Sequence, residues 1–331
     1  MKNLDFLIIG AQKCATTTLF EHLRGHPDIA MPLEKEVPFF CDDNCSFEDW
    51  SEFSARNFAD ANTRQLWGKA TPQYMSDPSA AERIHSLMPD TKLVAILRDP
   101  VERCWSHFRM GQRRETESRD FAVVIDELLT SECQKQSRTL ALPAHEDGYE
   151  SEGDFYVAWS EYGRILNDFS NRFGSQQLLV LYTEELESDP EGTLDRLLSF
   201  VGLQPGYRPP SLGKHLHRGG SGNRVSPALR GWLRERKVIY WLWQMLPDAR
   251  RGRMRFQYEQ WNVLDRVTAA QLPEDLMQQL VQHFSEDIAS LLALPVPVPP
   301  WANRYVDFSD RQICYHSKLH NAKITHSHYA T

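Results

Sequence analysis

The chain has 331 residues, of which 41% are hydrophobic and 25% are charged, with 9 tryptophans and 16 phenylalanines. This composition is typical of a folded globular protein and excludes a disordered or fibrous chain. The formal net charge of −8 disfavours general nucleic-acid binding, which needs a basic surface that neutralises phosphates. No nucleic-acid partner is therefore expected.

Location and redox state can also be predicted from the chain. No apolar run approaches the roughly 20 residues of a membrane-spanning helix, so no transmembrane segment is expected. The N-terminal residues lack a secretory apolar region and a small-residue cleavage site, which favours a cytoplasmic location. The 6 cysteines are sparse and show no C-x-x-C spacing. Free thiols are expected, with a Cys41–Cys45 disulfide as the alternative.

The start of the chain predicts a strand, a loop and a helix in succession. Leu4 to Ile9 is a short apolar run, and Gly10 to Ala15 is made of small and polar residues around one lysine. Thr16 to Arg24 has the apolar spacing of an amphipathic helix, which Gly25 would end. This order places a loop directly at the N-terminus of a helix.

Two later apolar runs, Leu93 to Leu97 and Leu178 to Tyr182, predict further strands. Each is followed by a helical pattern that begins near a proline, Pro100 or Pro190, a residue favoured in the first turn of a helix. Strands that alternate with helices form mainly parallel sheets covered on both faces. The expected fold class is α/β, with a central parallel sheet flanked by helices and with helical insertions.

Three more helices are predicted from apolar spacing, at Phe155 to Phe173, Ala228 to Leu246 and Glu274 to Leu292. We expect one domain over residues 1–300 and a tail over residues 301–331. The tail contains histidines whose loose spacing fits no defined metal site, so no metal site is expected. These histidines are His316, His320, His326 and His328.

The stretch from Gly111 to Gly153 differs from its surroundings. It is polar and poorly periodic apart from Phe121 to Leu129. Such a stretch favours an insertion over the functional edge of the sheet, where it would shape the specificity of a site.

The first loop has the composition of an anion-binding site. Residues 10–18 read GAQKCATTT, with small residues, one lysine and three hydroxyls at the start of a helix. Backbone amides, the helix dipole and Lys13 would together hold a phosphate or a sulfate. The loop is not a Walker A motif, which has a glycine directly before its lysine. A structural turn with an exposed lysine is the alternative.

Residues 97–106, LRDPVERCWS, carry a second set of anion-binding groups directly after a predicted strand. Arg98 would lie at the carboxyl end of that strand, and Ser106 on the helix after it. An arginine can make paired contacts with a phosphate, and a serine can donate a hydroxyl hydrogen bond. In isolation, Arg98 and Asp99 would also fit a structural ion pair.

Together these segments resemble the sulfotransferases that use 3′-phosphoadenosine-5′-phosphosulfate (PAPS), particularly the heparan sulfate sulfotransferases and related bacterial enzymes. The resemblance implies a P-loop-like sheet, and it implies that Arg98 and Ser106 bind the 3′-phosphate of the donor. The first loop is similar to the 5′-phosphosulfate-binding loop of the family. Its implied donor contacts are Lys13, Cys14, Ala15, Thr16, Thr17 and Thr18.

Two further segments extend the resemblance. Residues 35–40, KEVPFF, resemble the block that carries the catalytic carboxylate, which implies that Glu36 is the general base. From the residues alone, a surface glutamate beside Lys35 is the alternative. Residues 68–74, GKATPQY, resemble a segment near the active site, in which Lys69 would orient Glu36 or the acceptor.

A late loop, residues 219–227 (GGSGNRVSP), resembles the basic glycine-rich loop that closes over the 3′-phosphate. Its expected donor contacts are Gly222, Asn223 and Arg224, and an ordinary connector before a helix is the alternative. Some N-sulfating relatives place a histidine after the 3′-phosphate motif, where this chain has Met110. His107 lies nearer the serine and is expected to be a histidine on a helix face.

The resemblance implies an enzyme that moves a sulfuryl group from PAPS to a hydroxyl, less readily to an amine, of a small-molecule, lipid or saccharide acceptor. Glu36 would take the acceptor proton, and Lys13 would stabilise the leaving oxygen of 3′-phosphoadenosine-5′-phosphate (PAP). No metal ion is required. The alternatives are a P-loop-like nucleotide kinase and a nucleotide-binding protein without chemistry.

Overall fold

The structure, a computed structural model, describes residues 2–32, 35–62, 64–141, 152–213, 222–225, 245, 254, 258, 261–264 and 272–306. Its centre is a five-stranded sheet in the order β2-β3-β1-β4-β5, in which every pairing is parallel. The predicted α/β class is confirmed. The strands are β1 (Phe6–Gly10), β2 (Ile29–Ala30), β3 (Leu66–Ala70), β4 (Lys92–Leu97) and β5 (Leu178–Tyr182).

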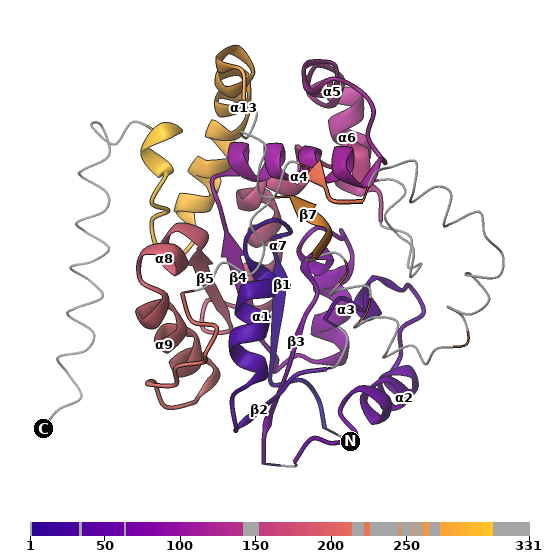
Figure 1. Cartoon of the computed structure of the whole chain (residues 1–331), viewed down its shortest axis with the longest axis vertical. Helices are drawn as coiled ribbons and strands as arrows, with labels where there is room; N and C mark the ends of the chain where they lie inside the picture. Colours follow the sequence, from indigo (N-terminus) through magenta and orange to yellow (C-terminus); the bar gives the residue numbers. More distant parts are fainter. Residues whose placement is uncertain are drawn as a thin grey trace, which may run out of the picture.

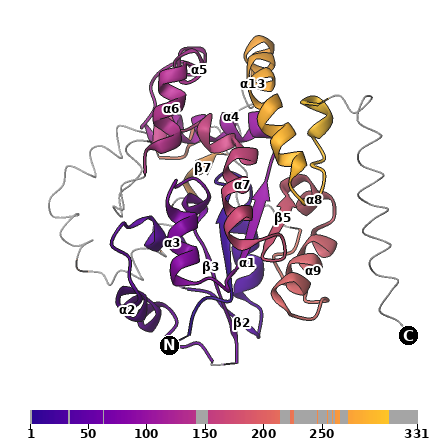
Figure 2. The same cartoon turned by 180° about the vertical axis from the view of Figure 1, so that it is seen from behind.

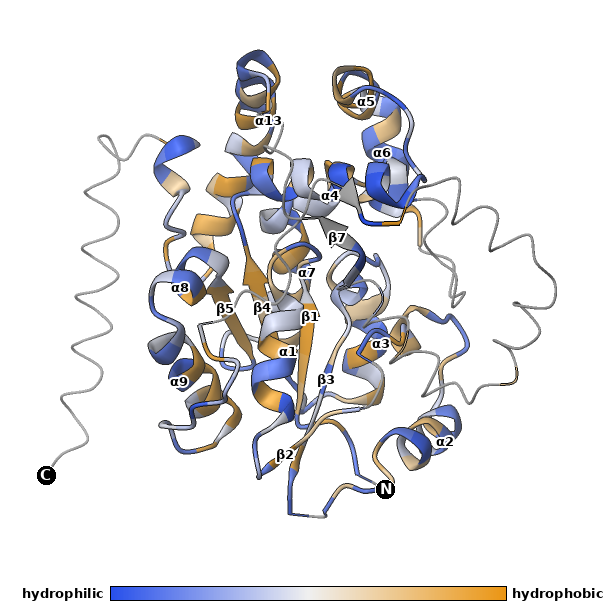
Figure 3. Cartoon of the chain, viewed as in Figure 1, coloured by the Kyte–Doolittle hydropathy of each residue, from blue (hydrophilic) through white to orange (hydrophobic). Residues whose placement is uncertain are grey.

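The central strands are continuous apolar runs because both of their faces are covered. All five residues of β1 are buried, and apolar side chains dominate β1, β4 and β5 (Figure 3). Leu7 lies opposite Leu93, which in turn lies opposite Leu178. The core is therefore built around these three strands.

Helices cover both faces of the sheet, with α1 on one face and α3 and α7 on the other (Figures 1 and 2). The described helices of the main body are α1 (Thr16–Arg24), α2 (Phe47–Asn57), α3 (Ala80–Leu87), α4 (Pro100–Arg114), α5 (Phe121–Leu128), α6 (Ser131–Thr139), α7 (Tyr162–Phe173), α8 (Thr183–Ser188), α9 (Pro190–Val201) and α13 (Glu274–Ala293). The shorter elements are η1 (Phe39–Cys41), η2 (Pro72–Met75), η3 (Glu152–Asp154), η4 (Ala158–Ser160), η5 (Ala302–Arg304) and the paired strands β6 (Gly222–Asn223) and β7 (Val263–Leu264).

Helix α4 crosses above the carboxyl ends of the strands (Figure 1). Asp99 caps its N-terminus, where its Oδ1 accepts hydrogen bonds from the backbone N–H groups of Val101 and Glu102 at 3.0 and 3.2 Å. Pro100 occupies the first turn, where a backbone N–H would have no partner within the helix, so its absence costs no hydrogen bond. This arrangement sets α4 over the edge at which parallel sheets bind ligands.

Residues 301–306 are packed against the start of α4. Tyr305 donates its hydroxyl hydrogen to Asp99 Oδ1 at 2.7 Å, and Arg304 Nη1 donates to Asp99 Oδ2 at 2.6 Å. Trp301 and Tyr305 are buried. The first residues of the predicted tail are thus anchored, while the boundary at residue 300 stays a prediction and the tail histidines lie outside the described residues.

Several elements differ from their predicted bounds. Helix α7 begins at Tyr162 rather than at Phe155, because residues 158–160 form a separate 3-10 turn. Helix α4 continues to Arg114, past the predicted start of the insertion at residue 111. The insertion also contains α6, whose polar sequence has little apolar periodicity. The helix predicted over Ala228 to Leu246 lies outside the described residues, apart from Met245.

The described cysteines are all free thiols, so the alternative Cys41–Cys45 disulfide is not formed. Among the helices of the described ranges, none is long and apolar enough to span a membrane. The described residues also contain no cluster of three or more His, Cys, Asp or Glu side chains suited to a metal ion.

Candidate active site

The loop between β1 and α1 has a tightly determined backbone. Ala11 N–H donates to the carbonyl of Ile96 at 2.8 Å, which ties the loop to β4. Lys13 and Ala15 have φ angles of 72° and 65°, in the left-handed region that residues with a Cβ rarely adopt. At Gly10, a Cβ would lie 2.6 Å from Met75 Cβ, so only glycine fits there.

Lys13 lies in a positively charged environment. Its Nζ is 3.6 Å from Met110 Sδ. Burial, followed by the positive charges of Arg113, Arg114 and Arg103, lowers the pKa of Lys13 from 10.5 to about 7, although Glu152 partly opposes this shift. A lysine held among arginines would be stabilised by a bound anion, as expected of a phosphate or sulfate site.

The other loop residues divide into buried and accessible groups. The Cys14 side chain is fully buried, with its Sγ 3.7 Å from the Tyr162 hydroxyl, and burial raises the pKa of this thiol to about 11. Cys14 N–H donates to the Ala11 carbonyl at 3.2 Å. Thr17 and Thr18 are half-buried in the first turn of α1. That helix has no side-chain cap and no acidic residue in its first turn, which suits an anion.

Lys35 links the predicted base, Glu36, to residues 10–18, which we call the donor loop. Its Nζ donates to Glu36 Oε1 at 2.5 Å and to Thr16 Oγ1 at 3.3 Å. Partial burial pushes the pKa of Glu36 upward, but the positive charges of Lys35 and Arg114 outweigh it, so this pKa lies below its ordinary value. Glu36 is therefore ionised at neutral pH and can accept a proton.

Lys69 is fully buried and contacts the residue next to Glu36 rather than Glu36 itself. Its Nζ donates to the Val37 carbonyl at 2.5 Å and to Thr71 Oγ1 at 2.5 Å. The Tyr74 hydroxyl donates to the same carbonyl at 2.9 Å. These contacts fit the predicted orienting role toward Glu36, and complete burial places the lysine away from an acceptor in solvent.

Arg98 and Ser106 are both half-buried, at the end of β4 and on α4. Arg98 Nη2 lies 3.3 Å from Glu102 Oε2 across a partly exposed ion pair. The alternative Arg98–Asp99 pair is not formed, because the Asp99 carboxylate caps α4 and binds Arg304 and Tyr305. Exposed pairs of this kind contribute little, so a phosphate could displace Glu102 from Arg98.

Sequence reasoning missed a network of four buried side chains, Gln12, Arg103, His107 and Glu152, which we call the buried network. Arg103 is completely buried, and its Nε donates to the Gln12 carbonyl at 3.1 Å. Its Nη1 donates to the carbonyl of Tyr156 at 3.0 Å, and its Nη2 donates to His107 Nδ1 at 2.8 Å. One arginine therefore joins the donor loop to α4 and to the turn before α7.

His107 belongs to this network and is not exposed on a helix face. An arginine can only donate, so His107 Nδ1 accepts and its Nε2–H donates to Glu152 Oε2 at 3.0 Å. Burial and the positive charge of Arg103 lower the pKa of His107 to about 4, so the ring is neutral. The spacing of Arg103 and His107, four apart on α4, was a signal that they share a face.

The described part of the late loop is fixed by a segment that the sequence did not single out. Arg224 N–H donates to the Asn262 carbonyl at 2.7 Å, and Val225 N–H donates to Asn262 Oδ1 at 2.8 Å. The Arg224 guanidinium lies 5.8 Å from the ring of Trp261. Residues 222 and 223 pair with β7, whereas residues 219–221 and 226–227 lie outside the described residues.

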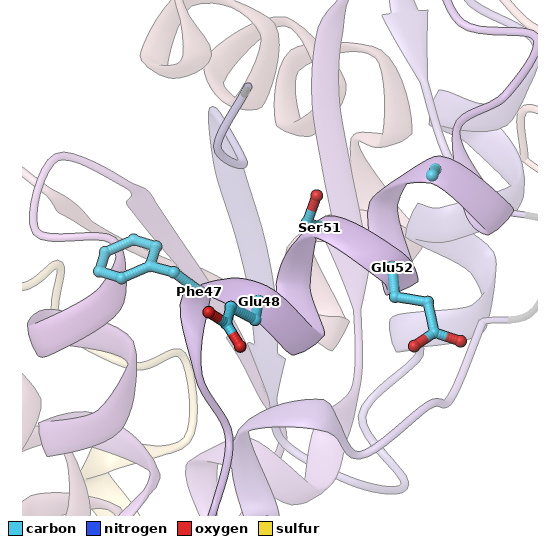
Figure 4. A pocket seen from close by; sticks show the side chains of 5 residues that line it. Phe47, Glu48, Ser51 and Glu52 are labelled. Atoms are coloured by element: carbon cyan, nitrogen blue, oxygen red, sulfur yellow. The ribbon is translucent and has the colours of Figure 1, made fainter.

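A hollow lies along α2 (Figure 4), and none of the predicted site residues is among the residues that line it. Among the described residues it is lined by Phe47, Glu48, Ser51, Glu52 and Ala55. The hollow has no cationic side chain in this lining, so it offers nothing that would hold a phosphate or sulfate. The candidate site therefore remains the cationic region between the donor loop and α4.

Comparison with known proteins identifies the family that this chain resembles. Residues 44–207 match the sulfotransferase family, a range that includes Lys69, Arg98 and Ser106. Heparan sulfate glucosamine 3-O-sulfotransferase 6 of Homo sapiens is 31% identical over 208 residues, which cover 60% of this chain and 52% of that protein. Membrane-associated sulfotransferase kil1 of Dictyostelium discoideum is 31% identical over 131 residues, which cover 39% of this chain and 28% of that protein.

The matched segments span about half or less of the length of these curated relatives. A solved sulfotransferase structure from Alicyclobacillus acidocaldarius superposes with a TM-score of 0.59 at 20% identity, over 88% of this chain and 96% of that chain. This superposition supports a shared fold, with the central parallel sheet and its flanking helices. The resemblance predicted from the motifs is confirmed, and the chain belongs to the sulfotransferase family.

Proposed function

We propose that this chain transfers a sulfuryl group from PAPS to a hydroxyl, less readily to an amine, of a small-molecule, lipid or saccharide acceptor. The observation that carries the proposal is the contact of Lys35 with both Thr16 of the donor loop and Glu36. It brings an ionised carboxylate beside an anion-binding loop. Two curated relatives are named for 3-O-sulfation of heparan sulfate, which supports a hydroxyl acceptor and makes a saccharide a natural first choice.

The residues present fit the donor. Lys13 and the open first turn of α1 would hold the phosphosulfate, because this region combines a cation with helix N–H groups. Arg98 and Ser106 would hold the 3′-phosphate at the adjoining strand end. Residues 222–224, on their β-ribbon, would cover the same end of the donor. PAPS supplies the activated sulfuryl group when bound.

The chemistry then follows from two side chains. Glu36 would accept the hydroxyl proton of the acceptor while the new oxygen–sulfur bond forms. Lys13 would stabilise the charge that develops on the phosphate oxygen as its bond to sulfur breaks. Lys69 would keep the backbone at Val37, and hence Glu36, in place. The products are the sulfated acceptor and PAP.

Two measurements test the proposal. Calorimetry should give a much higher affinity for PAP than for adenosine 5′-phosphate, because Arg98 and Ser106 are assigned to the extra phosphate. Arg98→Ala should weaken PAP binding by about 10–100-fold, as expected for a lost charge-assisted contact, and leave adenosine 5′-phosphate binding unchanged. Arg172→Ala, on α7, is the matched control. Equal affinity of the unmodified protein for both nucleotides would contradict the proposal.

Turnover separates the proposal from its alternatives. Labelled PAPS incubated with hydroxyl and amine acceptors of each class should yield a sulfated product, read by mass. A nucleotide kinase would instead turn over ATP with Mg²⁺ and ignore PAPS. A nucleotide-binding protein without chemistry would bind PAP and sulfate no acceptor.

A further inference from the structure

The buried network connects the end of the predicted insertion to the donor loop. Glu152 lies in η3, at the end of the insertion, and only 7% of its surface is exposed. Its Oε1 accepts from Gln12 Nε2 at 3.1 Å, and its Oε2 accepts from His107 Nε2 at 3.0 Å. Both carboxylate oxygens are therefore fixed, one by the loop and one by α4.

The direction of each hydrogen bond in this network is determined. Arg103 donates to His107, which leaves the histidine only its Nε2–H to give to Glu152. Burial alone would raise the pKa of Glu152, but the hydrogen bond from His107 and the charge of Arg114 keep this pKa below its ordinary value. Glu152 thus stays negatively charged inside the protein.

Lys13 is surrounded mainly by positive groups. Arg103, Arg113 and Arg114 face it from α4, and all three lower its pKa. His107 is also on α4 but is neutral. Glu152, in η3, opposes the arginines and raises the pKa of Lys13.

Among the described residues, Arg98 and Glu184 also lie near the loop, where both act on Cys14. Lys35 and Glu36 lie near its other end, at Thr16. Lys35 binds the loop at Thr16, and its charge is paired with Glu36. The charge of Arg114 lowers the pKa of Glu36, and the charge of Glu152 raises it. Glu152 is therefore the carboxylate that is both hydrogen-bonded to the donor loop and close enough to act on Lys13.

We propose that Glu152 is a positioning residue that keeps Lys13 protonated and correctly placed for sulfuryl transfer. The inference rests on the function proposed for Lys13 above. It extends that function to a carboxylate at the end of the acceptor-side insertion, so the segment expected to shape acceptor specificity also sets the charge of the donor site.

Glu152→Gln is the direct test, because it removes the charge and keeps the shape. The Gln12 Oε1 atom is buried without a described partner, so rotation of its amide would let it accept from the new glutamine. The readout is the titration of the Lys13 side chain by NMR in the free protein, with its signal assigned from Lys13→Met. Loss of one nearby negative charge should lower the Lys13 midpoint by about one pH unit.

In the same variant, the alkaline limb of the pH profile of kcat/KM should move to lower pH, as the Lys13 midpoint does, because transfer needs protonated Lys13. His107 is neutral above pH 5 with or without Glu152, so it does not produce this limb. A purely structural role for Glu152 would lower activity equally at every pH and leave the Lys13 midpoint unchanged. That result would overturn the inference.

A rescue and a control sharpen the test. The double variant Gln12→Glu with Glu152→Gln returns a carboxylate to the same hydrogen-bonded pair, and it should restore the Lys13 midpoint to within about half a pH unit of the original. It also serves if the single variant does not fold. Glu117→Gln removes a buried carboxylate of the same insertion that binds Arg119 instead, and should leave the midpoint unchanged.

The NMR titration does not depend on turnover, so the two proposals fail separately. A protein that sulfates no acceptor contradicts the proposed function, while a shifted Lys13 midpoint still supports the electrostatic role of Glu152. An active protein whose Lys13 midpoint is the same in the single variant contradicts the inference alone. A double variant that titrates like the single variant contradicts it as well.

Discussion

The donor loop and the segment of Lys35 and Glu36 are attached to the same sheet in different ways. The loop is fixed by a backbone bond to β4 and by the buried network. The Glu36 segment is fixed by the bond of Lys69 to the Val37 carbonyl and by the bond of Lys35 to Thr16. Glu36 itself is held by an ion pair with Lys35 in which the glutamate is 33% exposed. Exposed pairs contribute little to stability, so Glu36 is held more loosely than Lys13.

This difference suits the two partners of the reaction. A donor that is always the same nucleotide benefits from groups placed before binding, because no reorganisation is needed during reaction. In the proposed reaction, Glu36 would have to approach the acceptor hydroxyl, and a less rigid attachment would allow that movement. If the two attachments are independent, a change that breaks one of them should alter one side of the reaction and leave the other side unchanged.

The largest effect is expected for Glu36→Gln. Without the carboxylate the acceptor proton has no base, so kcat should fall about 10²–10⁴-fold. PAP affinity should stay unchanged, because the glutamine can still accept from Lys35. Steady-state kinetics and calorimetry measure the two quantities, with Glu48→Gln on the exposed side of α2 as control. Unchanged turnover would remove Glu36 from the mechanism.

Lys13→Met should lower transfer about 10²–10³-fold, because it removes the cation that stabilises the leaving oxygen. It should also stabilise the free protein. The pKa of Lys13 is about 7 in the folded protein against an ordinary 10.5, so the unfolded chain binds more protons between these values. The stability of the unmodified protein therefore rises with pH across that window. Below pH 7, where Lys13 is charged in the folded protein, its burial destabilises the fold most.

The stability gain of Lys13→Met should consequently be about 1–3 kcal/mol at pH 6, after allowance for solvent near the loop, and should shrink toward pH 10. Urea unfolding at both pH values measures it. Lys135→Met, on the exposed surface of α6, is the control and should show no such pH dependence. A gain that is equal at both pH values would contradict a depressed Lys13 pKa.

Lys69→Met should separate the two regions most clearly. It removes the donor that holds the Val37 carbonyl but leaves the Tyr74 hydroxyl bonded there. We expect kcat to fall by about 10-fold through misplacement of Glu36, while the KM for PAPS stays the same. A rise in that KM with unchanged kcat would instead show that Lys69 serves the donor.

Tyr305→Phe should have the smallest effect. It removes one hydrogen bond to Asp99, and the remaining contacts still cap α4. The free energy of unfolding should fall by about 1 kcal/mol, with transfer unchanged. Denaturant titration measures the first quantity, and a large loss of PAP affinity would indicate that this contact also positions Arg98.

Much of the fold could be predicted because its signals are local. Helix α1 and strand β5 have the predicted bounds, and α4 and α9 begin at the predicted prolines. Strand β3 was missed because its run LWGKA includes a glycine and a lysine. That lysine is Lys69, whose buried contact lies with a carbonyl 32 residues earlier in the chain.

The candidate site was predictable where function depends on residue type in a short segment. Lys13, Glu36, Arg98 and Ser106 each lie in such a segment. Glu152 does not lie in such a segment, because its partners are 45 and 140 residues away in the chain and the residues next to it form no recognisable motif. Only a structure brings such distant polar side chains together, since a buried carboxylate must be paired wherever its partners come from.

The contacts of Asp99 also constrain the order in which the protein can mature. Asp99 caps the helix that carries Ser106, yet two of its partners lie 205 and 206 residues later in the chain. During synthesis the donor edge of the sheet is therefore incomplete until almost all the described residues have emerged from the ribosome. A nascent chain released before residue 304 would contain the donor motifs without the bonds of Arg304 and Tyr305 to Asp99 at the start of α4.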